Sequence, residues 1–567
     1  MTRPLSGTPL LALTVSLCVA AACQGPDLED FVKENASRFA PPDQSWHQGP
    51  EVDLDGTGPA RYVGALMEAY DAERAMETVR FTDGFYREPA NHGYEAVIDH
   101  LISRLRAAGF GGDDGRFTLD VVRSPLDKPA WTPRAGHLAL VEDSGAEIVL
   151  HAFDQPADHD RTMLPAGAPA CDLEGPIRFS LDELEPGDIL VTEARLSQVG
   201  SRAAQRGAIA VLSASLYPFN VDPTGAERHM AAMQYTSIPD KLGLPAAQIS
   251  PLSYLRLEGA GTGARVRFRA EVDLREGATL RTLVARIHGD GKAEECVTSA
   301  AHVQEPGAND NASGVGGLLE GAVSLAAALR NGTVDWPQRS LVFVWGDEFD
   351  QTERWIEWTD LTPIAGISSD MVGQSQALTG SRALLERGPD PGAIAPRLPD
   401  EHTPWGAGRV TEEDLHPNGL AVIARCALVD VGLASGGWES ADHPWEGGSD
   451  HDVFLDRQIP AVLFWHFTDF AYHTSLDRLD MVDPDEIERT EVAVLATMLA
   501  VADPRPEDTR RYVVSAELER LVRTAAAREA GDDENADAWD EWSNGATAWL
   551  RALCMDIPLE EAAVKPR

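Results

Sequence analysis

The chain has few basic residues and few cysteines for its length. Its 567 residues carry 48 Lys and Arg against 91 Asp and Glu, a formal net charge of −43 at pH 7. This deficit of positive charge argues against nucleic acid or an anionic membrane surface as a partner. Four cysteines lie beyond the N-terminal region, widely spaced and without a Cys-x-x-Cys pair, and this spacing assigns no disulfide. They are Cys171, Cys296, Cys426 and Cys554.

Long apolar runs are also scarce, apart from the N-terminus. After Arg3, residues 9–22 are apolar but too short to be a stable membrane span, and they end in three alanines before Cys23. Small residues before a cysteine predict a signal peptide, residues 1–22, with either lipoprotein processing at Cys23 or ordinary cleavage. We therefore expect an exported protein, either a bacterial cell-envelope lipoprotein or a periplasmic or secreted one. We expect no other stretch to be long and apolar enough to cross a membrane.

The length predicts two or three domains, and a hydrophobic content of 43% is enough for a sizeable core. A polar, Pro/Gly-rich stretch follows the signal, and helical, β-rich, mixed and helical patterns then succeed one another. The predicted boundaries are 23–60 for a tether, 61–125 for the N-terminal part of a main domain, 126–281 for an inserted domain, 282–505 for the rest of the main domain, and 506–567 for a helical extension. We expect two helices in the extension, separated at Gly531.

Within the insertion, short β-rich runs alternate with turns. Asp172-Leu-Glu-Gly-Pro, Gly187-Asp-Ile-Leu-Val and Ala203-Ala-Gln-Arg-Gly-Ala-Ile-Ala-Val-Leu follow in that order. This order resembles a protease-associated (PA) domain, and a generic α+β insertion is the alternative. PA domains are typically inserts that shape access to a protease site.

Several predicted strands of the main domain end in residues that can bind a metal. Apolar runs lead to His302 with Asp310, to Glu348, to Asp370 and to His473. Open α/β sheets bind ligands beyond the carboxyl ends of their strands, and Zn²⁺ accepts imidazole and carboxylate ligands. The sequence therefore predicts a metal site at one end of an α/β sheet.

The motifs around these residues resemble the M28 metallopeptidase family. They are His302, Gly307-Ala-Asn-Asp-Asn-Ala-Ser-Gly, the acidic pair after Phe343-Val-Trp-Gly, Ser369-Asp-Met-Val-Gly, Ser449-Asp-His and Tyr472-His-Thr-Ser-x-Asp. The resemblance implies a zinc-exopeptidase, aminopeptidase-like fold, with a mixed central sheet between helices. It also implies that Asp310 bridges two Zn²⁺ ions, one held by His302 and Asp370 and the other by Glu348 and His473. Co²⁺ or Mn²⁺ could substitute.

The resemblance assigns two further residues to catalysis. Asp347 stands where the family has its general base, and Tyr472 stands where some members have a tyrosine that steadies the tetrahedral intermediate. The family's base is usually Glu, so Asp347 is shorter by one methylene. Gln304 replaces an aspartate that commonly supports the first histidine. The first difference bears on activity because a general base must lie within about 3 Å of its proton. The second bears on metal binding because residues behind a ligand orient it.

We therefore expect an exported zinc aminopeptidase that acts on peptide or protein N-termini. Carboxypeptidase action and glutaminyl cyclisation are alternatives on this fold, and a metal-binding surface protein with little activity is another. His443, His451 and His466 are expected to be loop or supporting residues rather than ligands. Residues 374–410 are Pro/Gly-rich and predict a long loop on the active-site side.

Overall fold

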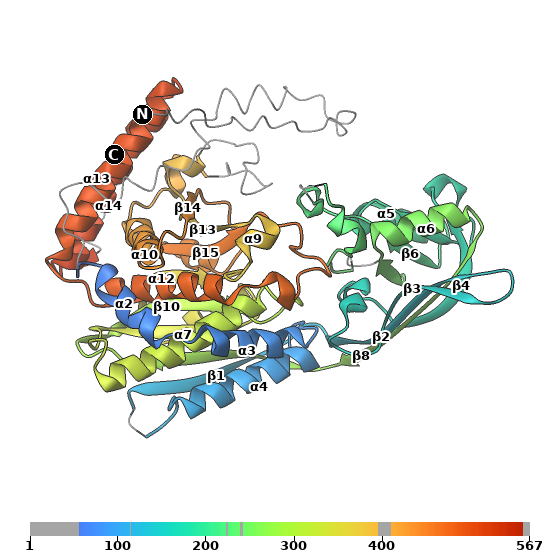
Figure 1. Ribbon diagram of the computed structural model, residues 1–567, viewed down its shortest axis with the longest axis horizontal. Helices are drawn as coiled ribbons and strands as arrows, with labels where there is room; N and C mark the ends of the chain where they lie inside the picture. The colour runs from blue at the N-terminus through green and yellow to red at the C-terminus, as the bar shows by residue number, and fades with distance from the viewer. Residues whose placement is uncertain (1–55, 114, 223–224, 239–241, 395–409, 560–567) are drawn as a thin grey trace, which may run out of the picture.

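The computed structural model describes residues 56–113, 115–222, 225–238, 242–394 and 410–559 (Figure 1). The predicted signal peptide, Cys23 and most of the predicted tether lie outside these residues. The described chain contains two β-sheets, with helices packed around the larger one. The predicted mixed α/β fold is confirmed.

The larger sheet is mixed and has eight strands in the order β1-β9-β11-β10-β12-β15-β13-β14. Four central strands, β11, β10, β12 and β15, run parallel to one another, whereas β1, β9 and β13 pair antiparallel with β9, β11 and β15. The bounds are β1 Phe117–Pro125, β9 Thr279–Ile287, β10 Lys292–His302, β11 Arg339–Gly346, β12 Thr362–Ser369, β13 Arg382–Glu386, β14 Ser440–His443 and β15 Ala461–Phe467.

Both faces of this sheet are buried, as β11 shows. Its alternate residues Leu341, Phe343 and Trp345 belong to the largest hydrophobic core, whereas Val342 and Val344 belong to a smaller core on the other face. Successive side chains of a strand point to opposite faces, so a strand covered on both sides needs a continuous apolar run. This run is what made the strand recognisable in the sequence.

Helices cover both faces of the sheet (Figure 1). Six of them contribute to the largest core together with the two C-terminal helices described below, and two short ones pack on the smaller core. The six are α2 Ala60–Ala69, α3 Ala72–Asp83, α4 His92–Ala107, α7 Ala312–Asn331, α10 Leu420–Ala434 and α12 Pro484–Ala502; the two are α8 Asp350–Trp358 and α11 His451–Leu455.

Helix α7 is long and apolar enough to cross a membrane, by length and composition alone. The expectation that no stretch beyond the N-terminus would qualify is therefore wrong by that criterion. However, 89% of its most apolar window is buried inside the protein. Its apolar surface packs against α3, α12 and the sheet, so its composition reflects burial on all sides.

The second sheet has seven strands in the order β3-β2-β8-β4-β5-β6-β7 and lies at one end of the molecule (Figure 1). Its strands all lie between β1 and β9, which pair with each other in the main sheet. The assignment of this insertion to the PA type stays a prediction. The bounds are β2 Ala130–Val141, β3 Glu147–Phe153, β4 Cys171–Arg178, β5 Ile189–Thr192, β6 Ala210–Ser213, β7 Ala246–Gln248 and β8 Arg265–Arg275, with helices α5 Leu196–Gln205 and α6 Pro251–Ala260.

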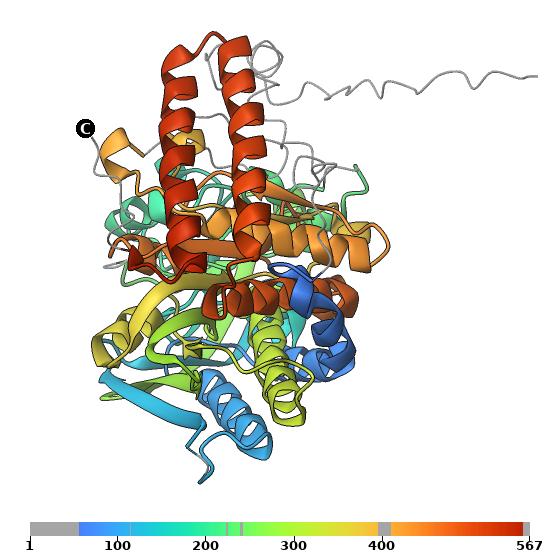
Figure 2. The same cartoon turned by 90° about the vertical axis from the view of Figure 1, so that its left-hand side faces the viewer.

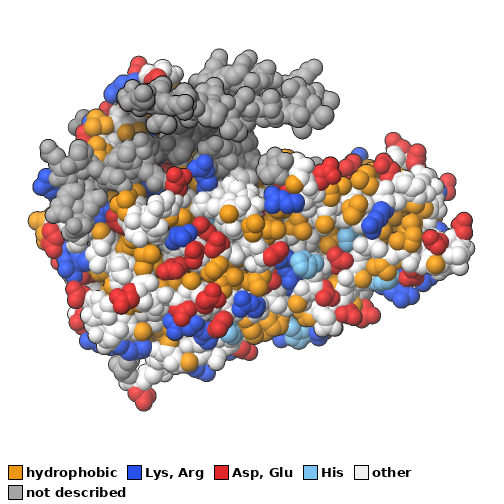
Figure 3. Space-filling view, in the orientation of Figure 1, with side chains coloured by type: hydrophobic (Ala, Val, Ile, Leu, Met, Phe, Trp, Pro, Cys, Tyr) orange, Lys and Arg blue, Asp and Glu red, His pale blue; other side chains and the backbone are white. Residues whose placement is uncertain are grey.

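Ion pairs join β8 to β4 across the second sheet. Arg267 lies opposite Glu174 and Arg269 lies opposite Asp172, and each pair is in contact, at 2.6 and 3.1 Å. Directly opposite charges stabilise a sheet modestly. On the face of the whole molecule that Figure 3 shows, acidic and basic side chains are interspersed among apolar ones.

The segment predicted as one long loop, 374–410, contains regular structure. It includes α9 (Gln376–Thr379) and strand β13, which pairs with β14 and β15 inside the main sheet. The expectation of a loop is therefore wrong for this part. A strand of five residues is too short to show a clear period, and only its distant partners define it. Residues 395–409 lie outside the described residues.

The predicted C-terminal helices form a hairpin of α13 (Asp508–Glu529) and α14 (Asp533–Cys554), with Gly531 between them (Figure 2). Two buried ion pairs attach α13 to the main domain. Arg387 contacts Glu519 at 2.5 Å, and Arg511 contacts Asp430 at 2.6 Å. The hairpin therefore packs on the main domain.

Candidate metal centre

The carboxyl ends of the parallel strands meet beside the start of α7. His302 is the last residue of β10, Glu348 lies just beyond β11, and Asp370 directly follows β12. Asp310 lies just before α7, and His473 lies in the loop after β15. The five side chains that the sequence predicts as ligands therefore come from the end of the sheet where α/β proteins bind ligands.

His302, Glu348 and Asp370 form a first cluster, with one donor atom from each within 4.8 Å of the others. Nε2 of His302 is 3.1 Å from Oδ1 of Asp370 and 3.4 Å from Oδ1 of Asp310. Nδ1 donates to the backbone carbonyl of Gln304 at 3.1 Å. A neutral ring would therefore turn the lone pair of Nε2 toward two carboxylates, an arrangement that calls for a cation between them.

Glu305, Asp310 and His473 form a second cluster under the same distance limit. Nε2 of His473 is 2.9 Å from Oδ2 of Asp310 and 2.8 Å from Oε2 of Glu305. Asp310 thus turns one oxygen toward each imidazole and lies between the two clusters. Glu348, which the resemblance pairs with His473, lies here with the first cluster.

The net charge of the two clusters suits a pair of divalent ions. Burial lowers the pKa of His302, but the negative charges of Asp370 and Glu348 outweigh it and raise that pKa well above its usual value. The pKa of His473 is raised in the same way, against burial, by Glu305 and Asp310. The two clusters hold four carboxylates and two imidazoles, so two divalent ions would balance the charge. These N and O donors fit Zn²⁺.

Hydrogen bonds from distant segments hold the turn that carries Asp310. The Asp477 carboxylate accepts from the backbone N–H of Asp310 at 2.9 Å and from that of the preceding residue at 2.7 Å. The Asn311 side chain caps α7 and also accepts from the backbone N–H of Met371 at 3.1 Å. These bonds fix Asp310 relative to Asp370.

Gln304 supports a different ligand from the one expected at its position. Its side-chain oxygen accepts from the backbone N–H of Glu348 at 2.7 Å, and its amide lies 3.4 Å from Oε2 of the same residue. The ring of His302 is oriented by the backbone carbonyl of Gln304 instead. The glutamine thus holds Glu348 in place, and the lost aspartate is replaced by a main-chain acceptor.

The Ser449-Asp-His stretch, which the sequence left without a role, links two ligand-bearing segments. The Ser449 hydroxyl donates to Oδ2 of Asp370 at 2.8 Å. The Asp450 carboxylate accepts from the backbone N–H of Phe349 at 3.1 Å and from the Thr352 hydroxyl at 2.6 Å. The first bond orients a ligand, and the other two secure the start of α8 just after Glu348.

Asp347 and Tyr472 adjoin the two clusters. Burial, together with repulsion from Asp350, raises the pKa of Asp347 to about 7. The ring of Tyr472 stacks on His473 with centroids 4.0 Å apart, and burial raises the pKa of its phenol well above its usual value. Each side chain therefore lies next to a residue of a different cluster.

The insertion forms one wall of the centre. The Asn220 amide donates to the backbone carbonyl of Tyr472 at 2.6 Å. The backbone N–H of Tyr235 donates to the backbone carbonyl of His473 at 2.7 Å. The ring of Tyr235 also meets that of His473 edge-on, with centroids 5.5 Å apart. The loop that carries Tyr472 and His473 is thus braced by the second domain.

The other histidines near the last motifs lie outside both clusters. Nε2 of His451 is 3.1 Å from Oε1 of Glu386, and Nε2 of His466 is 3.1 Å from Oε2 of Glu486. His443 lies in a separate group with Glu386 and Glu446.

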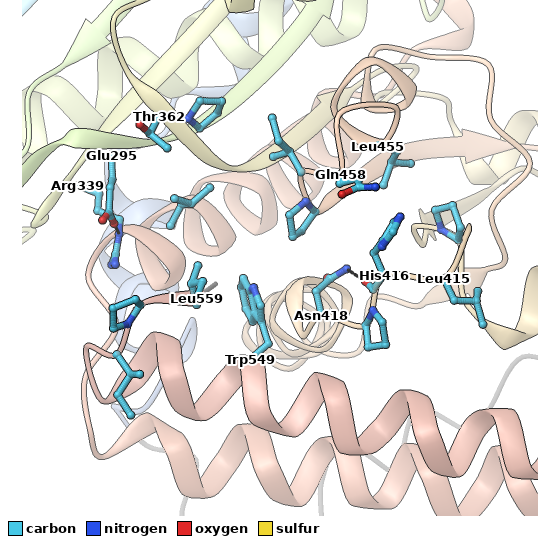
Figure 4. Close-up of a pocket in the computed structure, with 18 of the residues that line it drawn as sticks. Glu295, Arg339, Thr362, Leu415, His416, Asn418, Leu455, Gln458, Trp549 and Leu559 are labelled. Carbon is cyan, nitrogen blue, oxygen red and sulfur yellow. Dashed lines mark hydrogen bonds and ion pairs between the residues drawn. The ribbon is translucent and has the colours of Figure 1, made fainter. Parts of the chain in front are cut away.

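A cavity of about 700 Å³ lies at the opposite end of the main sheet (Figure 4). Its lining includes Glu295, Arg339 and Thr362, near the starts of the parallel strands, and Trp549 of α14. It contains no residue of the two clusters, so it is separate from the candidate centre.

No motif or spacing in the sequence marks Glu305 as a ligand. It lies three residues after His302, in the loop before Asp310, and the resembled motifs assign it no role. The only signal in the sequence was an acidic side chain close to a predicted ligand. Its contact with His473, 168 residues away, appears only in the folded chain.

Comparisons with known proteins agree with these observations. The family described as peptidase family M28 matches residues 281–390. The chain is 25% identical to the probable lipoprotein aminopeptidase LpqL of Mycobacterium tuberculosis (strain ATCC 25618 / H37Rv) over 477 residues, 77% of this chain and 86% of the relative.

Two solved structures show the same fold. A peptidase M28 precursor from Shewanella amazonensis SB2B has a TM-score of 0.52 and 16% identity, covering 78% of this chain and 97% of the other. The zinc aminopeptidase BSAP from Bacillus subtilis has a TM-score of 0.50 and 16% identity, covering 77% and 96%. The family match over residues 281–390, the relative and the shared fold together support a hydrolase of the M28 peptidase type.

Proposed function

We propose that this protein is an exported zinc-dependent exopeptidase, an aminopeptidase that removes residues from the N-termini of peptides or proteins. The main support is the position of Asp310, whose two oxygens face the Nε2 atoms of His302 and His473. A carboxylate between two imidazoles suits a pair of metal ions, and paired ions serve several classes of hydrolase, aminopeptidases among them.

The proposed metal ligands are the five residues predicted from the sequence. Asp310 would bridge two Zn²⁺ ions, with His302 and Asp370 on one side and His473 on the other. The resemblance assigns Glu348 to the ion of His473, whereas its carboxylate lies with His302 and Asp370 in this structure.

The reaction follows from the groups around the centre. When bound, the ions would activate a water and polarise the scissile carbonyl. The Asp347 carboxylate takes a proton from the attacking water and returns it to the leaving amine. The Tyr472 hydroxyl donates a hydrogen bond to the carbonyl oxygen as that oxygen gains negative charge.

The proposed location is the bacterial cell envelope, with a lipid on Cys23. Support comes from the apolar N-terminal run that ends in three alanines before Cys23 and from the relative named a probable lipoprotein aminopeptidase. The peptidase domain and the insertion would then lie outside the cytoplasm.

The insertion, which braces Tyr472 and His473, would limit which peptides reach the centre.

The test is mass spectrometry of a peptide library incubated with the purified protein, each peptide with a free or an acetylated N-terminus. We expect stepwise N-terminal shortening of the free peptides alone, abolished by a chelator and restored by Zn²⁺. Shortening from the carboxyl end would replace the aminopeptidase proposal with carboxypeptidase action. An absence of any metal-dependent cleavage would refute the peptidase proposal.

A further inference from the structure

We propose that Glu305 is a further metal ligand, which binds the same ion as His473 and Asp310. The inference rests on the proposed function in one respect, that metal ions occupy the centre. It goes beyond that function because it adds a ligand that neither the motifs nor the comparisons assign.

Three donor atoms converge beside His473. Oε2 of Glu305 and Oδ2 of Asp310 lie 2.8 and 2.9 Å from the same atom, Nε2 of His473. Zinc binds imidazole nitrogen and carboxylate oxygen at about 2.0–2.2 Å. Donors about 3 Å apart can therefore share an ion after movements of a few tenths of an ångström. Any ion bound to Nε2 of His473 would meet both carboxylates.

The backbone at Glu305 is strained and firmly held. Its φ is +79°, a left-handed conformation that is unusual for a residue other than glycine. Its backbone N–H donates to the carbonyl of Arg87 at 2.9 Å. The buried guanidinium of Arg87 donates to the carbonyls of Val303 at 2.8 Å and Gly307 at 2.7 Å, on either side of Glu305. Strained residues held this firmly often serve function.

The two clusters are balanced only when Glu305 is counted as a ligand. Glu348 lies with His302 and Asp370 and is held there by Gln304. Among the described residues, the second cluster without Glu305 would hold only Asp310 and His473. With Glu305, each ion would have an imidazole, a glutamate and one oxygen of the shared aspartate.

A different role for Glu305 is an ion pair with protonated His473. The two roles predict opposite effects on metal binding. If Glu305 only paired with the imidazolium, its removal would make His473 easier to deprotonate, and the ion would bind equally well or more tightly. If Glu305 is a ligand, its removal weakens binding of one ion.

The experiment compares the full-length protein with its Glu305→Gln variant. The number of bound ions is measured after dialysis against micromolar Zn²⁺, and the affinity for each ion is measured by titration against a chromogenic chelator. We expect two ions per chain in the wild type. In Glu305→Gln we expect one ion to be retained and the other to bind at least about 100-fold more weakly, since even the loss of a residue that only orients a ligand costs about 10–100-fold.

Glu294→Gln is the control, because Glu294 is an exposed carboxylate near the start of β10, at the other end of the strand from His302 and in neither cluster. It should retain both ions. Glu305→Asp, which keeps a carboxylate, should bind the second ion more tightly than Glu305→Gln does. Circular dichroism of the metal-free proteins checks that the variants fold.

Unchanged or tighter binding of both ions by Glu305→Gln would overturn the inference, and so would a wild type that binds no metal. The two failures are distinguishable. The first leaves metal-dependent cleavage of the peptide library intact, whereas the second also removes the proposed function.

Discussion

Single side chains at the centre carry much of the proposed chemistry. Asp347 is one methylene shorter than the glutamate usual at this position, and it is half-buried next to Glu348. Gln304 holds the backbone N–H of Glu348 at 2.7 Å, so the turn after β11 is fixed from the side of β10. Because the side chain is short and the turn is held, the Asp347 carboxylate has little freedom to move toward the attacking water.

Replacing Asp347 with asparagine should therefore remove proton transfer without removing metal. The amide keeps the size of the side chain but does not accept the proton of the attacking water, and positioned general bases contribute about 10²–10⁴-fold. We expect kcat to fall by about that factor, with unchanged zinc content. Loss of metal in the variant would show that Asp347 acts on the ligands instead.

Ser449 tests whether a hydrogen bond to a ligand carboxylate strengthens metal binding. Its hydroxyl donates to Oδ2 of Asp370 at 2.8 Å, and residues that orient metal ligands typically contribute 10–100-fold in affinity. Ser449→Ala should weaken binding of one zinc ion by about that factor in a competition titration. The exposed Ser144→Ala is the control, and equal affinities in the two variants would refute the role.

At the scale of elements, buried polar contacts join helices to strands around the centre. Glu486, at the start of α12, accepts from the Trp438 indole at 2.8 Å and the Gln376 amide at 2.9 Å, and lies 3.1 Å from His466 of β15. Burial raises the pKa of Glu486, but the bond and charge of His466 and the other donors outweigh it and lower that pKa from 4.5 to about 2. The ionised form is therefore favoured by folding.

The sign of the resulting pH dependence follows from this lowered pKa. The stabilisation is complete above the unfolded value near 4.5 and is lost as the pH falls toward 2. The shift corresponds to about 3 kcal/mol. Glu486→Gln should lower the thermal unfolding midpoint at pH 6, and the gap from wild type should narrow as the pH falls below 5. A gap that stays constant with pH, like that of the exposed Glu73→Gln control, would contradict this account.

At the scale of the whole molecule, the chain has a formal net charge of −43. The two clusters bring four carboxylates together at the end of the main sheet, beside the loop that Asn220 of the insertion braces. Like charges at short range destabilise the folded chain unless cations offset them.

Metal removal should therefore destabilise the protein as well as inactivate it. A ligand that binds only the folded state stabilises it by about 4 kcal/mol at a thousand times its Kd. We expect dialysis against a chelator to lower the thermal unfolding midpoint and added Zn²⁺ to restore it. An unchanged midpoint would show that the four carboxylates are compensated without metal.

The sequence alone determined the mixed α/β fold and indicated the end of the sheet and the candidate ligands, because these signals are local. Apolar strands such as the one before His302, a turn before a helix at Asp310, and ordered motifs require only neighbouring residues. Changes of pattern along the chain also predicted an insertion over residues 126–281 and two C-terminal helices separated at Gly531.

Only the tertiary structure decided which side chains meet. Strand β13 was predicted as loop, because its partners β14 and β15 lie far along the chain. Glu305 joined the centre because Arg87, more than two hundred residues earlier, holds its loop, and Asn220 of the insertion braces the loop of His473. Contacts between segments so far apart leave no period or spacing in the sequence, since they depend on how separate elements pack.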